Sequence, residues 1–253
     1  MVKMENVCAG YSGEEILHDI NLEFGAGQVT VIVGPNGCGK STLLKTIVRL
    51  QEHSEGTILI DEIPIEKYES AQLAQRVSYL PQNKRTPDIG VFRMVLHGRF
   101  AYLNYPRRYR EEDYEVAHRA LKWVGMENFA HKNVNELSGG NQQNVYIAMI
   151  LAQDTNTILL DEPTNYLDIA HQLKMMKLAR GLADSGKAVV IVLHDLPQAF
   201  QTADKIVVID DGRVKACGNP ETVYRSGIVQ EVFGVKFERL KVEDEWKYFV
   251  CER

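Results

Sequence analysis

The chain has 253 residues and a formal net charge of -5, with 45% hydrophobic and 25% charged residues. This composition is ordinary for a globular protein with a sizeable core, and the negative charge argues against nucleic-acid binding through a general basic field. No apolar run approaches the roughly 20 residues that span a bilayer, and residues 1–5 do not resemble a secretory signal, so we expect a cytosolic chain.

The N-terminal segment predicts strand structure. Residues 16–24 alternate in part between apolar and polar side chains, as a half-buried strand does. Tyr11 stands alone between turn-like residues, where its ring could stack on an adenine base or simply pack against the protein. Residues 25–27, Gly-Ala-Gly, then turn the chain into the next predicted strand.

The following stretch predicts a strand, a glycine-rich turn and a helix. Residues 29–33 form an apolar run typical of a buried strand, and residues 43–48 predict the start of a helix. The turn between them completes a G-x-x-x-x-G-K-[ST] motif and consists of Gly34, Pro35, Asn36, Gly37, Cys38, Gly39, Lys40, Ser41 and Thr42. Glycines let successive backbone N–H groups face a phosphate, and the helix N-terminus adds its positive dipole. We therefore expect a phosphate-binding P-loop here.

Individual roles are predicted for three side chains of the P-loop. Lys40 can reach the outer phosphates of a nucleotide, and the Ser41 hydroxyl is placed to ligate Mg²⁺. Cys38 lies inside the loop, where its alkylation would block phosphate binding unless it is only a small residue tolerated there.

Two strands are expected after the P-loop helix. Residues 55–61 predict a turn and a short strand, and residues 76–82 predict another strand, which Pro81 ends. Gln82 therefore sits where a strand leaves the sheet. Its amide could reach Mg²⁺ or an attacking water, or it could be merely solvated.

Residues from Thr86 to about Glu136 predict a small helical subdomain. Apolar residues recur there at helical spacing, at Val91, Val95, Leu96, Tyr114, Ala117, Leu121 and Val124. Residues 100–110 between these helices are aromatic and basic. This stretch could bind RNA or a partner protein, or it could be a solvated loop with a few packed aromatic rings.

A further helix is predicted from residue 139, with Ser138 as its N-cap. Gly139 and Gly140 leave free backbone N–H groups at the helix N-terminus, which could form a second anion site. This signal is weak alone, because many helices begin with Ser-Gly.

Two apolar strands then end in chemically active residues. Residues 157–161 lead into the paired acids Asp161 and Glu162, and residues 189–193 lead into His194. In a chain with a P-loop, Asp161 would hold Mg²⁺ through water, and Glu162 would orient or deprotonate the attacking water. His194 could contact the γ-phosphate or could be a packing residue.

The C-terminal part predicts two strands within residues 203–214, joined by an Asp-Gly turn, a helix near residues 221–224 and a mixed strand-like end. The four cysteines are scattered and form no close pair. That spacing fits neither a zinc site nor a disulfide framework.

In combination, these motifs resemble the ATP-binding subunit of ABC transporters over nearly the whole chain. The resemblance rests on Tyr11, the P-loop, Gln82, residues 137–140, residues 158–162, residues 165–168 and His194. It implies an α/β fold, a P-loop NTPase of ABC type, in which a mixed sheet core carries an antiparallel β subdomain and a helical subdomain insert. Residues 1–253 would form one ABC ATPase domain, with its core at 1–85 and 154–225, the helical subdomain at about 86–153 and a C-terminal extension at 226–253.

The resemblance also implies roles and partners. Tyr11 would stack on adenine, Gln82 would couple the metal to the helical subdomain, Glu162 would be the catalytic base and His194 would sense the γ-phosphate. Ser138, Gly139 and Gly140 would contact nucleotide bound on a partner subunit. We therefore expect ATP and Mg²⁺ as cofactors and a homodimer on the cytoplasmic face of the cell membrane. Its partners would be integral membrane permease subunits and, indirectly, a substrate-binding protein, with no nucleic acid.

A narrower likeness lies in residues 96–99, 147–155, 167–172 and 232–235. These segments are similar to the ATPases of importers for ferric siderophores, haem or cobalamin. The sequence departs from the family at residues 141–144, Asn-Gln-Gln-Asn, where relatives usually carry Gln-Arg-Gln-Arg. This loss of two arginines removes charge-assisted hydrogen bonds near the predicted helix, so we expect slower basal hydrolysis than with arginine at residues 142 and 144.

Two other classes of ABC protein are alternatives. A soluble assembly ATPase, such as a component of an iron–sulfur cluster scaffold, has a similar length and the same ATP motifs. DNA-repair and ribosome-associated ABC ATPases need a long coiled-coil insert or tandem cassettes, whereas this chain has one P-loop and no heptad run, so the assembly ATPase is the alternative that we retain.

Overall fold

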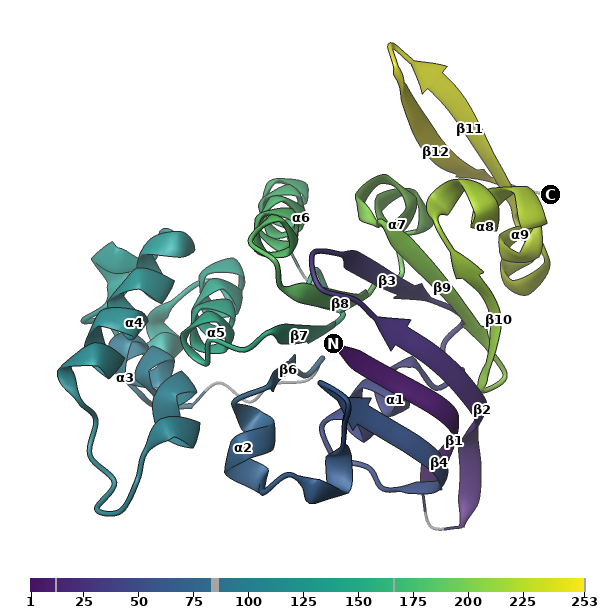
Figure 1. Cartoon of the computed structure of the whole chain (residues 1–253). Coiled ribbons are helices and arrows are strands. Elements are labelled where there is room, and N and C mark those ends of the chain that lie inside the picture. Colours follow the sequence, from purple (N-terminus) through teal and green to yellow (C-terminus); the bar gives the residue numbers. More distant parts are fainter. Residues whose placement is uncertain (12, 83–86, 166, 253) are drawn as a thin grey trace.

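A six-stranded sheet carries the P-loop at the C-terminal ends of its parallel strands (Figure 1). The structure is a computed structural model that describes residues 1–11, 13–82, 87–165 and 167–252, and the numbers of strands, helices and contacts given below refer to these residues. The strand order is β10-β9-β3-β8-β7-β6, with β10 antiparallel to β9 and the other pairs parallel. The strands are β3 (Val29–Val33), β6 (Val77–Leu80), β7 (Thr157–Asp161), β8 (Ala188–Val192), β9 (Lys205–Asp210) and β10 (Arg213–Gly218). Every residue of β3, β7 and β8 is buried, which explains why these strands read as unbroken apolar runs.

A second, antiparallel sheet covers the helix that follows the P-loop. Its order is β2-β1-β4-β5, formed by β1 (Val2–Tyr11), β2 (Glu14–Phe24), β4 (His53–Ile60) and β5 (Ile63–Pro64). Helix α1 (Lys40–Ile47) contacts β1, β2 and β7 and therefore lies between the two sheets. Leu43, Leu44 and Ile47 of α1 are fully buried there. The predicted mixed core with an antiparallel β subdomain is confirmed.

Helices α6 (Ile169–Asp184) and α7 (Leu196–Thr202) cover the opposite face of the six-stranded sheet, where α6 contacts β8 and β3 and α7 contacts β3. The predicted strand pair near the C-terminus is also confirmed. Asp211 and Gly212, both with positive φ, form the turn between β9 and β10, as expected for a tight hairpin.

The helical insert lies to one side of the sheets (Figure 1). Its main helices are α3 (Val91–Leu96), α4 (Glu111–Trp123) and α5 (Gly139–Ala152), which pack on one another. Shorter helices of the insert are η2 (His97–Tyr102), η3 (Glu127–Phe129) and η4 (Val134–Glu136), whereas η1 (Ile65–Lys67) and α2 (Ser70–Ala74) precede it, between β5 and β6. The predicted helical spacing is confirmed, although Thr86, the expected start of the insert, lies outside the described residues. The described helices are all too short or too polar to cross a membrane.

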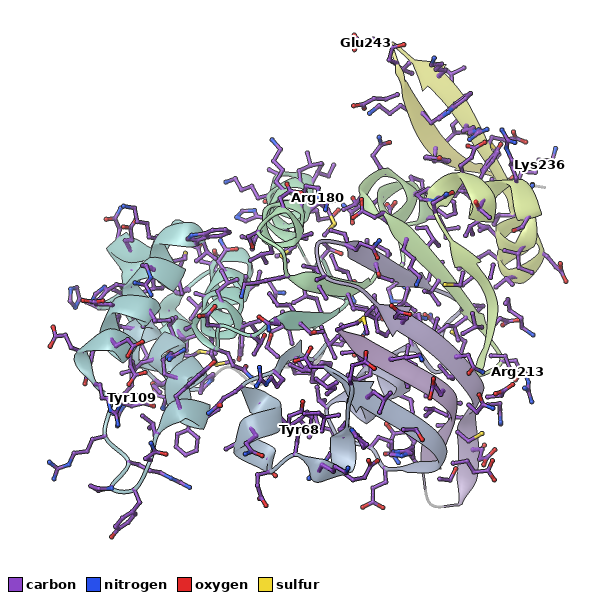
Figure 2. All side chains as sticks on the ribbon, in the orientation of Figure 1. Tyr68, Tyr109, Arg180, Arg213, Lys236 and Glu243 are labelled. Atoms are coloured by element: carbon purple, nitrogen blue, oxygen red, sulfur yellow. The ribbon has the colours of Figure 1, made fainter. Side chains whose placement is uncertain are left out.

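The aromatic and basic stretch forms η2 and a loop that projects from the helical insert. Tyr105 is 98% exposed, and Phe100 is also exposed, with the Arg107 guanidinium 4.8 Å from the centre of its ring. Figure 2 labels Tyr109 near the end of this loop. Tyr109 packs edge-on against the ring of Tyr114 in α4. The loop is thus partly packed and partly solvated.

The C-terminal segment ends in a hairpin that extends beyond the sheets. It comprises α8 (Pro220–Ser226), α9 (Ile228–Phe233), β11 (Lys236–Val242) and β12 (Glu245–Cys251). Figure 2 places Lys236 at the base of the hairpin and Glu243 at its tip. The rings of Phe237 and Tyr248 anchor the base against Phe200 of α7. The helix predicted near residues 221–224 is confirmed as α8.

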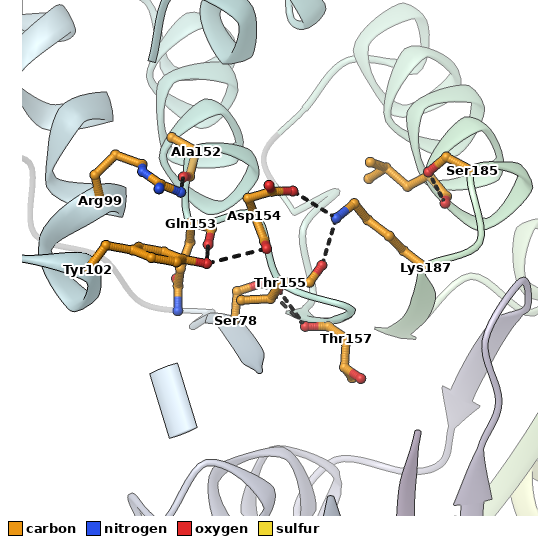
Figure 3. Close-up of polar contacts among 11 residues, drawn as sticks. Ser78, Arg99, Tyr102, Ala152, Gln153, Asp154, Thr155, Thr157, Ser185 and Lys187 are labelled. Atoms are coloured by element: carbon orange, nitrogen blue, oxygen red, sulfur yellow. Dashed lines mark hydrogen bonds and ion pairs between the residues drawn. The ribbon is translucent and has the colours of Figure 1, made fainter. Parts of the chain in front are cut away.

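A hydrogen-bonded junction joins the end of α5 to the start of β7 (Figure 3). We call residues 152–157, with the side chains that bind them, the α5–β7 junction. From the helical insert, Arg99 donates to the carbonyl of Ala152 and Tyr102 donates to the carbonyl of Gln153. The Gln153 side chain in turn donates to the carbonyls of Ala74 and Val77, 2.6 and 3.3 Å away.

The core side of the α5–β7 junction is held in the same way. Lys187 forms an ion pair with Asp154 at 3.1 Å and donates to the Thr155 carbonyl, while the Thr155 hydroxyl donates to Ser78. The motifs at residues 96–99 and 147–155, which the sequence singled out separately, are therefore in direct contact.

Candidate nucleotide-binding site

The P-loop connects β3 to α1 in a conformation that requires glycine. Gly39 has φ = 102°, and a Cβ there would lie 2.7 Å from Leu17. A Cβ on Gly34 would lie 2.1 Å from the carbonyl oxygen of Ile209 and 2.6 Å from the sulfur of Cys38. The loop therefore packs so closely on its neighbours that these two positions exclude any larger residue.

Lys40 is folded back onto the P-loop. Its Nζ donates to the carbonyls of Gly34 and Pro35 at 2.8 and 2.7 Å, and the residue is only 5% exposed. Cys38 Sγ lies 3.8 Å from the same Nζ. Burial raises the pKa of the Cys38 thiol, whereas Cys217 and Cys251 are exposed. These findings favour the interpretation of Cys38 as a small packed residue.

Asp161, at the end of β7, is held at both of its carboxylate oxygens. Ser41 Oγ donates to Oδ1 and the hydroxyl of Tyr79 donates to Oδ2, each at 3.1 Å. Burial raises the pKa of Asp161, and the two hydrogen bonds oppose that effect by stabilising the carboxylate. Burial also raises the pKa of Tyr79 far above its ordinary value, so this phenol keeps its proton and remains a donor. No sequence motif predicts a role for Tyr79.

Glu162 lies at the centre of a polar cluster. Its Oε1 is 2.5 Å from Nε2 of His194, while its Oε2 accepts from the side-chain amides of Gln82 and Asn165. Glu162 is 8% exposed and has φ = 50°, an uncommon conformation for this residue type. Such local backbone strain is typical of functional sites.

Asn165 is a second residue for which no sequence motif predicts an individual role. It lies three residues after Glu162, within the segment 165–168 on which the family resemblance partly rests. Its amide nitrogen is 2.5 Å from Glu162 Oε2. Tyr166 of the same segment lies outside the described residues.

A cavity of about 540 Å³ lies between the P-loop and this cluster. Its lining residues are Ile16, Asn36, Gly37, Gly39, Lys40, Ser41, Thr42, Gln82, Glu162, Asn165 and His194. The structure thus brings together residues that are more than 100 positions apart in the sequence. Tyr11 is at the exposed end of β1 and is not among the lining residues.

The predicted second anion site lies elsewhere on the chain. Ser138 is the N-cap residue of α5, as predicted, but its side chain makes no capping hydrogen bond. Gln142 donates to the Leu137 carbonyl at 3.0 Å, and Gln143 donates to the Pro163 carbonyl at 2.8 Å. Residues 138–140 do not line the cavity at the P-loop, so one chain does not bring the two predicted phosphate sites together.

The metal side of the site has the chemistry that magnesium requires. Mg²⁺ prefers oxygen ligands and usually binds one or two carboxylates, water and substrate phosphates. Ser41 lines the cavity, and its hydroxyl lies within hydrogen-bond distance of the carboxylate of Asp161, which is buried and is not itself among the lining residues. Among the described residues, no three His, Cys, Asp or Glu side chains gather as a separate metal cluster. These residues therefore fit a metal ion held largely by nucleotide and water.

Comparison with known sequences identifies a family for this arrangement. Residues 17–165 match the model of the ABC transporter domain. The chain is 40% identical over 234 residues to the petrobactin import ATP-binding protein FpuD of Bacillus anthracis, covering 92% of this chain and 86% of that protein. It is 37% identical over 234 residues to the ferric enterobactin transport ATP-binding protein FepC of Escherichia coli, with the same coverage.

Solved structures show the same fold. A putative metal-chelate type ABC transporter, in an inward-facing conformation, matches with a TM-score of 0.85 and 26% identity, over 100% of this chain and 98% of that one. The bacterial ABC transporter cassette MJ0796, solved as a dimer, matches with a TM-score of 0.75 and 32% identity, over 87% of this chain and 99% of that one. The fold, the P-loop and the sequence matches agree: the chain belongs to the ABC transporter family, as an ATP-binding subunit that hydrolyses ATP.

Proposed function

We propose that this chain hydrolyses ATP to energise the import of an iron chelate, a siderophore or haem, or of cobalamin. The observation that supports an ATPase most directly is the convergence of Gln82, Glu162 and His194 on one cavity with the P-loop. The cargo class is supported by relatives named for petrobactin and ferric enterobactin transport. The cargo itself would be bound by other chains, because this cavity is suited to phosphates.

Binding of the nucleotide begins with the P-loop. Its backbone N–H groups and the N-terminus of α1 would surround the phosphates, and Lys40 would leave the two loop carbonyls to pair with the outer phosphates. Ser41, Asp161 and Gln82 would hold Mg²⁺, which would supply positive charge next to those phosphates. Tyr11 would stack on the adenine ring from the edge of the site.

Hydrolysis requires Glu162 to be released from its present partners. A general base must lie within hydrogen-bond reach of the attacking water. In this structure both oxygens of Glu162 are occupied by His194, Gln82 and Asn165. We propose that bound nucleotide draws His194 to the γ-phosphate and leaves Glu162 to bind the water. Until that rearrangement occurs, Glu162 is not available as a general base.

A complete site would need two chains. Ser138, Gly139 and Gly140 lie outside the cavity, so they are free to cover nucleotide bound to a second copy. A homodimer would then enclose two ATP molecules and open after hydrolysis, because ATP has a higher affinity for the closed state. The dimeric MJ0796 cassette supports this arrangement.

The same proposal assigns partners and subdomains. We propose residues 86–153 as the helical subdomain, 1–85 and 154–225 as the core and 226–253 as a C-terminal extension. Permease subunits would dock between core and helical subdomain and hold the ATPase, as a peripheral protein, on the cytoplasmic face of the membrane. A substrate-binding protein would act through the permease alone.

Affinity purification from the native cell tests this function. A tagged chain, solubilised gently from membranes, should co-purify with a polytopic permease in stoichiometric amount. Cells that lack the chain should lose uptake of one ferric siderophore, haem or cobalamin, and regain it with the wild-type gene but not with Glu162→Gln. Exclusively soluble partners, with no chain in the membrane fraction, would contradict the transport role and favour an assembly ATPase.

A further inference from the structure

Tyr79 lies beside the metal side of the nucleotide site without being part of any motif. We infer that Tyr79 is a positioning residue, whose hydroxyl fixes the orientation of Asp161 so that its other carboxylate oxygen faces Ser41. Three features of the structure support this role: the reach of the tyrosine side chain, the way Tyr79 and Ser41 both bind Asp161, and the burial of the carboxylate.

The sheet register explains why a tyrosine is needed. Tyr79 of β6 pairs with Leu159 of β7, so Asp161 lies two residues farther along the neighbouring strand. Two residues of a strand extend roughly 6.6 Å, which is close to the length of a tyrosine side chain. A serine or threonine at this position would be too short, and phenylalanine would reach without donating a hydrogen bond.

The hydroxyl groups of Ser41 and Tyr79 bind different oxygens of the Asp161 carboxylate. Ser41 binds Oδ1 and Tyr79 binds Oδ2, each at 3.1 Å. Within the described part of the chain, Tyr79 is the one hydrogen-bond donor to Oδ2. Ser41 belongs to the P-loop and must also meet the nucleotide, whereas Tyr79 is anchored in the sheet and does not line the cavity. Of the two hydroxyl donors to Asp161, Tyr79 is therefore the one whose position does not depend on nucleotide.

Burial makes the lost hydrogen bond costly. Asp161 is 1% exposed, so water cannot easily replace a missing donor at Oδ2. Without the Tyr79 hydroxyl, the carboxylate would be free to turn toward Ser41 with both oxygens. The geometry offered to the metal would be less well defined, while the backbone of the P-loop would be unchanged.

Tyr79→Phe separates this role from packing, because it keeps the ring and removes only the hydroxyl. In one measurement, a fluorescent ATP analogue and the whole chain are kept at fixed concentrations while Mg²⁺ is titrated. In a second measurement, the affinity of the chain for the analogue is determined in excess chelator. The Mg²⁺ concentration for half-maximal binding should rise about tenfold, the size expected for losing one hydrogen bond to a charged group. The affinity of Tyr79→Phe for the ATP analogue in excess chelator should equal that of the wild type.

Tyr68→Phe is the matched control. Tyr68 is buried and donates to the Ile60 carbonyl at 2.8 Å, and its own carbonyl accepts from Arg49, which follows the C-terminal end of α1, whereas the P-loop precedes the N-terminal end. Loss of its hydroxyl should therefore leave the Mg²⁺ requirement unchanged. An unaltered Mg²⁺ requirement in Tyr79→Phe would overturn the inference. So would an equal loss of affinity with and without metal, or a failure of the variant to fold, since either outcome would assign the hydroxyl to structure alone.

Discussion

Replacing Arg99 by methionine removes one half of an ion pair that lies almost entirely out of water. Arg99 Nε is 3.0 Å from Asp113 Oδ1, and the two side chains are 7% and 8% exposed. The guanidinium also lies 3.7 Å from the centre of the Tyr102 ring and caps the Ala152 carbonyl. After the substitution, Asp113 would keep one backbone donor, the N–H of Arg110, and among the described residues it would have no ion-pair partner.

The expected cost follows from that isolated charge. Removing one partner of a buried pair destabilises a protein by about 3–5 kcal/mol. For a chain of this size each kcal/mol lowers the melting temperature by about 2–4 °C, so Arg99→Met should melt roughly 6–20 °C below the wild type. The measurement is thermal and urea unfolding of the nucleotide-free chain, followed by circular dichroism.

Two further variants test whether the unpaired buried charge causes the loss of stability. Arg213→Met alters an exposed arginine and should change stability by less than about 0.5 kcal/mol. Arg99→Met combined with Asp113→Leu should be more stable than Arg99→Met alone, because no buried charge is left without a partner. A single variant within about 1 kcal/mol of wild type, or a double variant that is less stable than Arg99→Met, would refute the argument.

Three predictions concern the nucleotide site. Glu162→Gln should bind ATP, lose hydrolysis and elute as an ATP-bound dimer, because it removes the expected base; a monomer at every protein concentration would contradict the two-chain site. Arginine at both Gln142 and Asn144 should raise basal phosphate release by restoring charge-assisted hydrogen bonds; equal or faster release by the unmodified chain would contradict this. Because burial raises the pKa of Cys38, less thiolate forms at a given pH, so maleimide should modify the two exposed cysteines first and reach Cys38 faster as pH rises. Mass spectrometry that finds Cys38 modified first near neutral pH would exclude this interpretation.

The predictable parts of the fold are those encoded in short segments. Residues 29–33 and 157–161 are buried on both faces, so their apolar runs identified β3 and β7 directly. The Asp211-Gly212 turn needs positive φ at both positions, and its residue types reveal that locally. The P-loop was evident because its glycines are required by the backbone itself.

The parts that were missed depend on contacts between distant segments. Tyr79 becomes significant only when the register of β6 against β7 places it beside Asp161, and periodicity does not specify that register. Asn165 gains its role from a turn that brings it back to Glu162. The capping hydrogen bond expected of Ser138 is absent because residue type predicts a position on the helix, not the side-chain rotamer.

The α5–β7 junction also bears on how this protein can change over evolutionary time. Arg99 and Ala152 are 53 positions apart yet hydrogen-bonded, and a Cβ on Gly98 would lie 2.2 Å from the Met149 carbonyl. Substitutions on one side of this contact therefore constrain those accepted on the other, and the two segments should covary among homologues. Chimeras made by exchanging parts of related ATPases should accordingly keep residues 96–155 from one parent, since a crossover inside that range would separate residues that were selected together.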